Sequence, residues 1–138
     1  MQRIPLRGAL SCGDFFAHKE SGIFIGPALV DAYRLCEDQD WIGFALSPAA
    51  TRRMREVGLP PDERLNYRYW PIPRKTGSSP DGGLPALLLG GATHEPNRNL
   101  CYTTLREMRE LVSPELIRAK YDHTIHFIEE MGTIRTVA

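Results

Sequence analysis

Apolar residues in the first part of the chain follow a spacing typical of short strands. Leu6, Leu10 and Cys12 share one parity and predict a strand over residues 6–12. A second apolar run, Ile23–Ile25, follows turn signals at Gly13-Asp14 and at residues 19–22. We therefore expect the two runs to pair as a hairpin with a long loop.

The next segment predicts two helices separated by a buried strand. Pro27 after Gly26 suits the first turn of a helix, where its missing N–H is not needed. The residues that follow form one apolar helical face: Ala28, Leu29, Ala32, Leu35 and Cys36. The apolar run 41–46 predicts a strand buried on both faces. Ser47-Pro48 is typical of a second helix start, and we expect that helix to run to Val57 and stop at Gly58.

The second half predicts two strands, two loops and two helices. Residues 65–70 are aromatic-rich and strand-like, with positions 65, 67 and 69 on one face, and residues 84–89 form another strand. Polar loops are expected over 74–83 and 90–99. A short apolar stripe over 105–112 and a helix from Ser113-Pro114 to Gly132 complete the pattern. The inward face of this last helix is expected to hold Ile117, Tyr121, Thr124, Ile125 and Ile128.

Composition narrows the class of protein. A length of 138 residues suits one domain, and 17 basic residues balance 17 acidic ones. This balance does not favour a nucleic-acid partner. The sequence has no apolar run of about 20 residues, so we expect no membrane insertion. The cysteines Cys12, Cys36 and Cys101 are odd in number and widely spaced. With no visible signal peptide, they predict reduced thiols in a soluble, cytoplasmic protein.

Two segments resemble a known family. The stretches 7–14 and 22–35 read RGALSCGD and GIFIGPALVDAYRL, and residues 119–128 read AKYDHTIHFI. These stretches are similar to the later part of class III adenylate and guanylate cyclase domains, closest to a bacterial subgroup that has diverged from the catalytic pattern. The first match covers about a third of the chain and is fairly specific, whereas the second is short.

The resemblance implies an α/β (α+β) fold with a ferredoxin-like, cyclase-type sheet. The sheet would be truncated at its N-terminal side and followed by additional C-terminal helices. It implies a single partial domain over residues 1–138, in which 1–58 match best and 59–138 supply the remaining strands, loops and helices.

The departures from the family bear on chemistry. The chain starts after both metal-binding aspartates of the family, so the resemblance implies no metal site and no cofactor in this chain. Mg²⁺ or Mn²⁺ would bind only if a partner supplied carboxylates. Val30 stands where the family has its transition-state asparagine, and Ile23 where it has its base-selecting aspartate. Arg34 matches the arginine that neutralises the phosphate, and is the candidate catalytic residue.

A nucleotide site, if present, is expected to use Arg34 and the backbone at Gly26, since helix starts present N–H groups to anions. The alternative for Arg34 is a solvated side chain. Asp14 and Asp31 form a weak candidate metal pair. The helical pair His123 and His126 is more typical of a polar helix face than of a zinc site.

Three functions remain open at this stage. The leading interpretation is a catalytically degenerate cyclase-like module, and not an enzyme, that acts in interaction or regulation or is a truncated copy of a longer protein. The second is a cyclase half-site, a phosphorus–oxygen lyase acting on ATP or GTP with metal carboxylates from a partner chain. The third is a small-ligand sensor. An unpaired edge near residues 6–12 or 41–46 predicts a homodimer, or pairing with a chain that carries the missing half.

Overall fold

A mixed four-stranded sheet forms the centre of the molecule in the computed structural model, which describes residues 4–77, 79–88 and 95–132. The strand order is β1-β4-β6-β5. These strands are β1 (Gly8–Leu10), β4 (Phe44–Leu46), β6 (Leu84–Leu87) and β5 (Arg68–Trp70). The fold is thus mixed α and β, as the sequence predicted at the level of class.

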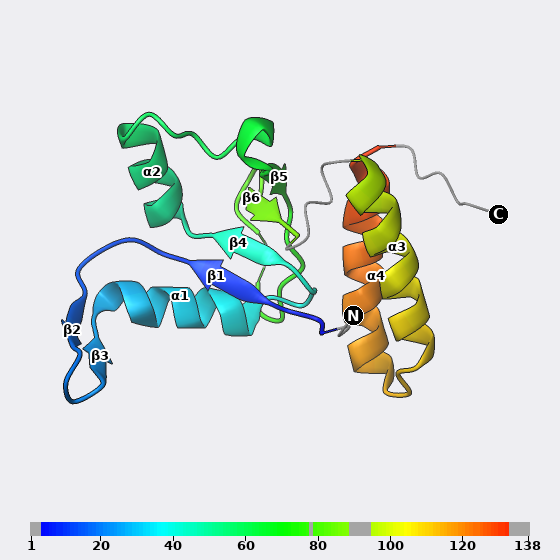
Figure 1. The fold of residues 1–138 in the computed structure, drawn as a ribbon, viewed down its shortest axis with the longest axis horizontal. Helices are drawn as coiled ribbons and strands as arrows, with labels where there is room; N and C mark the ends of the chain where they lie inside the picture. The colour runs from blue at the N-terminus through cyan, green and yellow to red at the C-terminus, as the bar shows by residue number, and fades with distance from the viewer. Residues whose placement is uncertain (1–3, 78, 89–94, 133–138) are drawn as a thin grey trace.

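Helices and a separate hairpin surround this sheet (Figure 1). The helices are α1 (Pro27–Asp38), α2 (Pro48–Glu56), α3 (Glu95–Glu110) and α4 (Glu115–Glu130), with a 3-10 turn over Glu63–Leu65. The hairpin consists of β2 (Phe16–His18) and β3 (Ile23–Ile25). It lies at the opposite end of the molecule from the pair α3 and α4.

The predicted hairpin between residues 6–12 and 23–25 is wrong. Strand β1 pairs in parallel with β4, with Gly8 opposite Phe44 and Leu10 opposite Leu46. Strand β3 pairs instead with the nearer segment β2, in antiparallel register. A short turn between β2 and β3 costs less loop entropy than the longer loop that we expected. Of the two segments that we expected to leave an unpaired edge, 6–12 contains the edge strand β1, whereas 41–46 contains the central strand β4; β5 is the other edge of this sheet.

Pro85 lies where the pairing between β4 and β6 ends. Strand β6 runs antiparallel to both β4 and β5, and Pro85 lies opposite Tyr69 in the ladder with β5. Since proline lacks an N–H, it can occupy only a position that does not donate to this ladder. On the other side of β6, the ladder with β4 ends at Ala45 and Ala86, the residue that follows Pro85.

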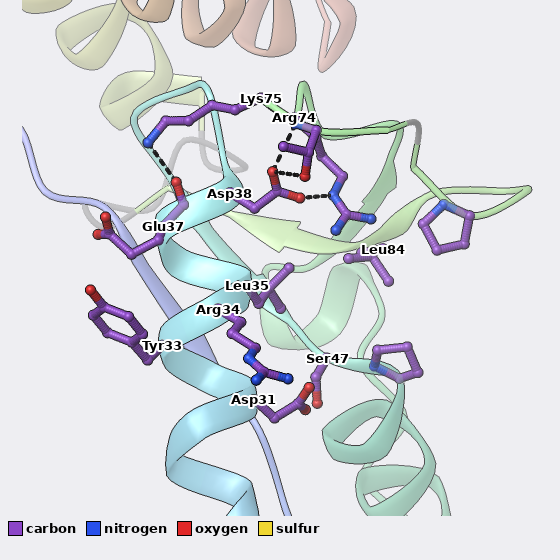
Figure 2. A pocket seen from close by; sticks show the side chains of 13 residues that line it. Asp31, Tyr33, Arg34, Leu35, Glu37, Asp38, Ser47, Arg74, Lys75 and Leu84 are labelled. Carbon is purple, nitrogen blue, oxygen red and sulfur yellow. Dashed lines mark hydrogen bonds and ion pairs between the residues drawn. The ribbon is translucent and has the colours of Figure 1, made fainter.

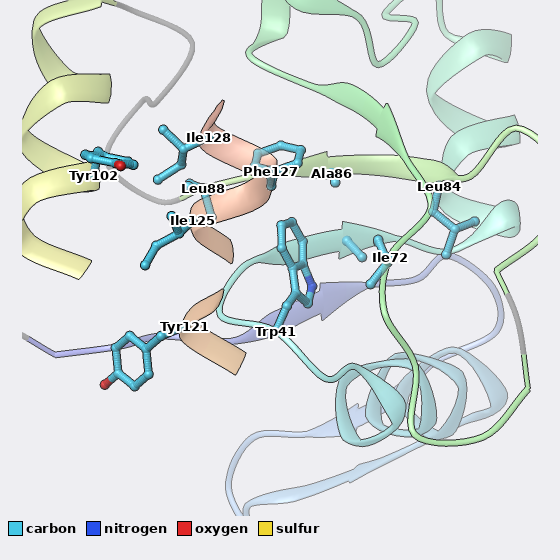
Figure 3. Close-up of a cluster of buried hydrophobic side chains, with 11 residues drawn as sticks. Trp41, Ile72, Leu84, Ala86, Leu88, Tyr102, Tyr121, Ile125, Phe127 and Ile128 are labelled. Carbon is cyan, nitrogen blue, oxygen red and sulfur yellow. The ribbon is translucent and has the colours of Figure 1, made fainter. Parts of the chain in front are cut away.

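The hydrophobic core lies between the sheet and the C-terminal helices (Figure 3). Trp41 and Phe127 are fully buried, with ring centroids 5.0 Å apart in an edge-to-face arrangement. The Phe127 ring also packs edge-to-face against Trp70, with ring centroids 5.1 Å apart. The predicted burial of Tyr121, Thr124, Ile125 and Ile128 is confirmed. The predicted strand over 41–46 is confirmed only for Phe44–Leu46, and Ile42 and Phe44 are half-buried rather than buried. The prediction for Ile117 is wrong, because its side chain is 44% exposed.

Helix α1 is covered far less than its sequence pattern predicted. Its range and its proline-led start are as expected, but none of its residues is buried. Leu29 is 44% exposed, and the other members of the predicted face are only half-buried. The helix packs along β1 and leaves its outer side open.

Two boundaries in the second half also differ from the predictions. Residues 65–70 do not form one strand, because Asn66 adopts a left-handed conformation (φ 64°) after the 3-10 turn. Trp70, on the opposite face from Tyr69, then packs on the core. The described part of the predicted loop 90–99, from Glu95 onward, belongs to α3; residues 90–94 lie outside the described residues.

Candidate functional site

An open cleft lies between α1, the start of α2 and the segment after β5 (Figure 2). Its volume is about 580 Å³. Helix α1 contributes one wall with Asp31, Arg34 and Asp38, and residues 74–76 contribute the opposite rim. Ser47 and Pro48, where β4 turns into α2, line the cleft between these two walls.

Arg34 is exposed on α1 and lines this cleft and also a neighbouring one of about 550 Å³. Within the described part of the chain, its guanidinium has no hydrogen-bond or ion-pair partner. Val30, one turn earlier, lines the second cleft with a side chain that is 47% exposed and carries no polar atom. The arginine therefore has access to a ligand, but its helical neighbour offers no hydrogen bond.

The structure does not bring Gly26 into the same cleft as Arg34. Gly26 has φ 154°, and a Cβ atom there would lie 2.4 Å from the carbonyl oxygen of Asp14. Its own carbonyl accepts hydrogen bonds from the N–H groups of Leu29 and Val30, at 3.1 and 3.2 Å. The residue thus allows the hairpin to close against the start of α1, which is a structural role.

The carboxylates beside Arg34 are held by other groups. The hydroxyl of Ser11 donates to Asp31 and lies 2.9 Å from the hydroxyl of Ser47. Ser47 is buried and caps α2 by accepting a hydrogen bond from the Ala50 N–H at 3.1 Å. This chain of hydroxyls joins α1, the end of β1 and the start of α2.

Asp38 organises the opposite rim of the cleft. Its carboxylate accepts hydrogen bonds from the hydroxyl and the N–H of Thr76, at 2.7 and 2.9 Å, and pairs with Arg74. The Thr76 hydroxyl is the main cause that holds the pKa of the Asp38 carboxyl below its ordinary value of 3.8. Lys75 donates to the carbonyl of Glu37. The segment after β5 is thereby fixed to the end of α1.

A two-metal centre does not fit these residues. Within the described ranges, no group of three or more His, Cys, Asp or Glu side chains is placed to hold a metal ion. The Asp38 carboxylate is held by Thr76 and Arg74, and Asp31, hydrogen-bonded to Ser11, is too small a ligand set for two hard cations. No step through Mg²⁺ or Mn²⁺ is therefore assigned to this chain.

A third cleft, of about 470 Å³, was not predicted from the sequence. Arg52 and Arg55 of α2 line it together with Tyr69 of β5. The Arg55 guanidinium donates to the Tyr69 hydroxyl and lies 5.9 Å from the centre of the ring. Tyr69 is 14 positions from Arg55 in the sequence, and no local pattern indicates that the two meet.

The remaining polar candidates have structural partners. His123 forms a hydrogen bond through Nδ1 with the carbonyl of Asp40 at 2.7 Å. His126 packs edge-on against Trp70, with ring centroids 5.5 Å apart, so the two histidines serve different contacts. Burial raises the pKa of the Cys101 thiol, which disfavours the thiolate that a nucleophile needs.

Two further findings concern membrane spans and similarity to known proteins. Among the described residues, no helix combines the length and the apolar character required to cross a bilayer. No family model matches the chain, and none of the curated proteins or solved structures compared with it is similar enough to count as a match.

Proposed function

We propose that this chain is a catalytically degenerate, cyclase-like module that works by association, and that its partner is a second copy of itself. The observation that carries the proposal is a large exposed apolar surface on the hairpin and the outer side of α1. We call it the association surface. Its members are Phe15, Phe16, Ile23, Phe24, Ile25, Leu29, Val30 and Tyr33, each between 44% and 66% exposed.

The hairpin has little to hold it in place within one chain. All six residues of β2 and β3 are exposed, and the extensive contacts of each strand are with the other strand. Phe15 and Phe24 stack at a centroid distance of 6.3 Å, which adds one local contact. An isolated two-stranded hairpin is only marginally stable in water. A partner that covers it would supply the missing packing.

The size of the association surface suits a protein interface. With large side chains about half exposed, it presents on the order of 800 Å² of accessible surface. A stable protein interface needs about 800 Å² from each partner, whereas exposed apolar patches on monomers are usually smaller. Phe16, Ile23 and Ile25 lie on one face of the hairpin and Phe24 on the other, so a second copy would bury this area in full only by packing against both faces.

The polar tip of the hairpin favours a protein partner over a bilayer. The turn between β2 and β3 carries Lys19 and Glu20, and His18 Nδ1 bonds the Ser21 hydroxyl at 2.7 Å. Inserting such charged groups into hydrocarbon costs several kcal/mol. The apolar side chains instead lie along the strands, where a second copy can pack against them from the side.

The absence of usable catalytic groups in the described site supports the degenerate part of the proposal. Val30 cannot donate to a transition state, and the carboxylates near Arg34 are bonded to other groups.

The mass of the protein at micromolar concentration tests the proposal. We expect light scattering to give twice the 15.6 kDa of one chain, falling toward 15.6 kDa on dilution. Phe24→Lys should shift the protein to monomer without unfolding it, because Phe24 is half exposed. Leu116→Lys is the matched control, since Leu116 is 83% exposed on α4, away from the association surface. A monomer at every concentration would overturn the proposal.

An activity assay separates the degenerate module from the half-site. With ATP or GTP and either Mg²⁺ or Mn²⁺, we expect the purified protein to form no cyclic nucleotide. Turnover that disappears in Arg34→Ala would contradict the proposal and favour a catalytic site that uses Arg34.

A further inference from the structure

We propose that the cleft beside Arg34 and the cleft beside Arg55 form one continuous furrow that binds an extended acidic peptide segment of a partner protein. The furrow meets the association surface only at Tyr33, which lines the cleft beside Arg34, and the variants that test the two proposals are different. It stands or falls independently of dimer formation.

The two clefts adjoin, because they share three lining residues. Pro48, Pro80 and Leu84 line both the 580 Å³ cleft and the 470 Å³ cleft. One end of the furrow is therefore at Arg34 on α1, and the other is at Arg55 on α2. The shared segment between the two ends is apolar.

The carboxylates along the furrow are already engaged. The Asp31 carboxylate accepts a hydrogen bond from the Ser11 hydroxyl. The Asp38 carboxylate accepts one from the Thr76 hydroxyl and forms an ion pair with Arg74. Glu37 pairs with Arg7 at 3.0 Å, and Glu56 pairs with Arg53 at 3.2 Å. The charges of Asp38, Glu37 and Glu56 are thus offset by arginines of the same chain, whereas Asp31, hydrogen-bonded among the described groups only to the neutral Ser11 hydroxyl, keeps its charge in the same cleft as Arg34.

The cations at both ends are not offset in this way. Within the described ranges, neither Arg34 nor Arg52 has a hydrogen-bond or ion-pair partner. Arg55 bonds only the neutral hydroxyl of Tyr69 among the groups described. The furrow therefore presents a net positive charge at each end, because Arg34 and Lys75 outweigh Asp31 at one end and Arg52 and Arg55 lie at the other. The surface between the two ends is apolar. A ligand complementary to it carries negative charge at both ends and apolar groups in the middle.

An extended peptide fits this arrangement better than a compact ligand. Each cleft alone has the volume of a small-molecule site, so one small ligand would reach only one charged end. A peptide in extended conformation spans about 3.3 Å per residue and can contact both ends at once. Arginine is well suited to bind its carboxylates, because the guanidinium can donate two parallel hydrogen bonds.

Fluorescence anisotropy with two short labelled peptides tests this proposal. The probe has glutamates at both ends and apolar residues between, and its counterpart has lysines in place of the glutamates. We expect the glutamate peptide to bind, the lysine peptide not to bind, and added salt to weaken binding. Arg34→Ala and Arg52→Ala should each reduce affinity by about five- to tenfold, the effect of losing one charge-assisted contact.

Arg64→Ala is the matched control. Arg64 is 80% exposed, pairs with Asp62 at 2.6 Å and does not line the furrow, so its loss should leave the affinity unchanged. Equal binding of the two peptides, or equal affinity in all three variants, would overturn the proposal. Binding of ATP or GTP at Arg34 without binding of the glutamate peptide would also overturn it, in favour of a compact anionic ligand. Circular dichroism of each variant confirms that the exposed substitutions leave the fold intact.

Discussion

The helix α4 and the helix α1 lie on opposite parts of the molecule, and the chain covers them very differently. Helix α4 buries Tyr121, Thr124, Ile125, Phe127 and Ile128, whereas α1 buries no residue at all. Both helices carry apolar residues at helical spacing, so their sequences alone give little reason to expect this contrast. What differs is the availability of a covering layer within one chain, which α4 finds in the sheet and in α3.

The two helices mark which part of the protein buries its apolar side chains within one chain. The sheet, α3 and α4 form a packed core, reinforced where Arg109 of α3 pairs with Asp122 of α4. The hairpin and the outer face of α1 keep their apolar side chains in contact with solvent. The first part is packed within its own chain, and the second is the part that we propose a second copy covers.

The largest expected effect on stability comes from removing a buried ring from the core. Phe127→Ala removes a fully buried ring that contacts Trp41 and Trp70, and should lower the free energy of unfolding by about 3–5 kcal/mol. Phe24→Ala in the hairpin should change the stability of the monomer by less than about 0.5 kcal/mol. Urea denaturation of dilute protein measures both values. Similar losses in the two variants would mean that the hairpin is as well packed as the core.

A smaller effect is expected where a buried hydroxyl joins α4 to the sheet. The Thr124 hydroxyl accepts a hydrogen bond from the Ile42 N–H at 2.8 Å and donates to the Lys120 carbonyl at 2.8 Å. Thr124→Val keeps the shape but leaves the Ile42 N–H without its partner, which costs about 1–3 kcal/mol. Thr124→Ser retains the hydroxyl and is the control. A valine variant as stable as the serine variant would show that this bond is not needed.

The smallest effect concerns the link between α1 and residues 74–76. Because the pKa of Asp38 is lowered in the folded protein, its contribution to stability is present above pH 3.8 and is lost as the pH falls through the folded value. Asp38→Asn should therefore reduce stability at pH 7, and the difference from the parent protein should shrink below pH 3.8. Thermal melting at a series of pH values measures this. A difference that stays constant across the series would exclude the charged hydrogen bonds as its cause.

Local signals in the sequence predicted the helices better than the strand pairing. Pro27, and Ser47 with Pro48, mark helix starts by local chemistry, and α1 and α2 begin there. The parallel partner of β1 could not be predicted, because pairing with β4 depends on a crossover through α1 rather than on nearby residues. The start of α3 was missed because Asn97 and Asn99 favour loops, and the packing of α3 on α4 overrides that preference.

The candidate site, too, could be predicted only in part. Arg34 emerged from the resemblance, and the structure places it at the edge of two clefts. Gly26 was also named, but it closes the hairpin rather than facing a cleft. Arg52, Arg55 and Tyr69 could not be foreseen, because their approach depends on how α2 lies against β5.

Hydrogen–deuterium exchange at several protein concentrations tests most directly whether the hairpin is completed by a second copy. We predict that amides in β2 and β3 exchange quickly in dilute protein and more slowly as the concentration rises into the micromolar range. Amides in α4 should be protected equally at all concentrations, because its burial is provided within one chain. Hairpin amides that exchange at the same rate at every concentration would contradict the account.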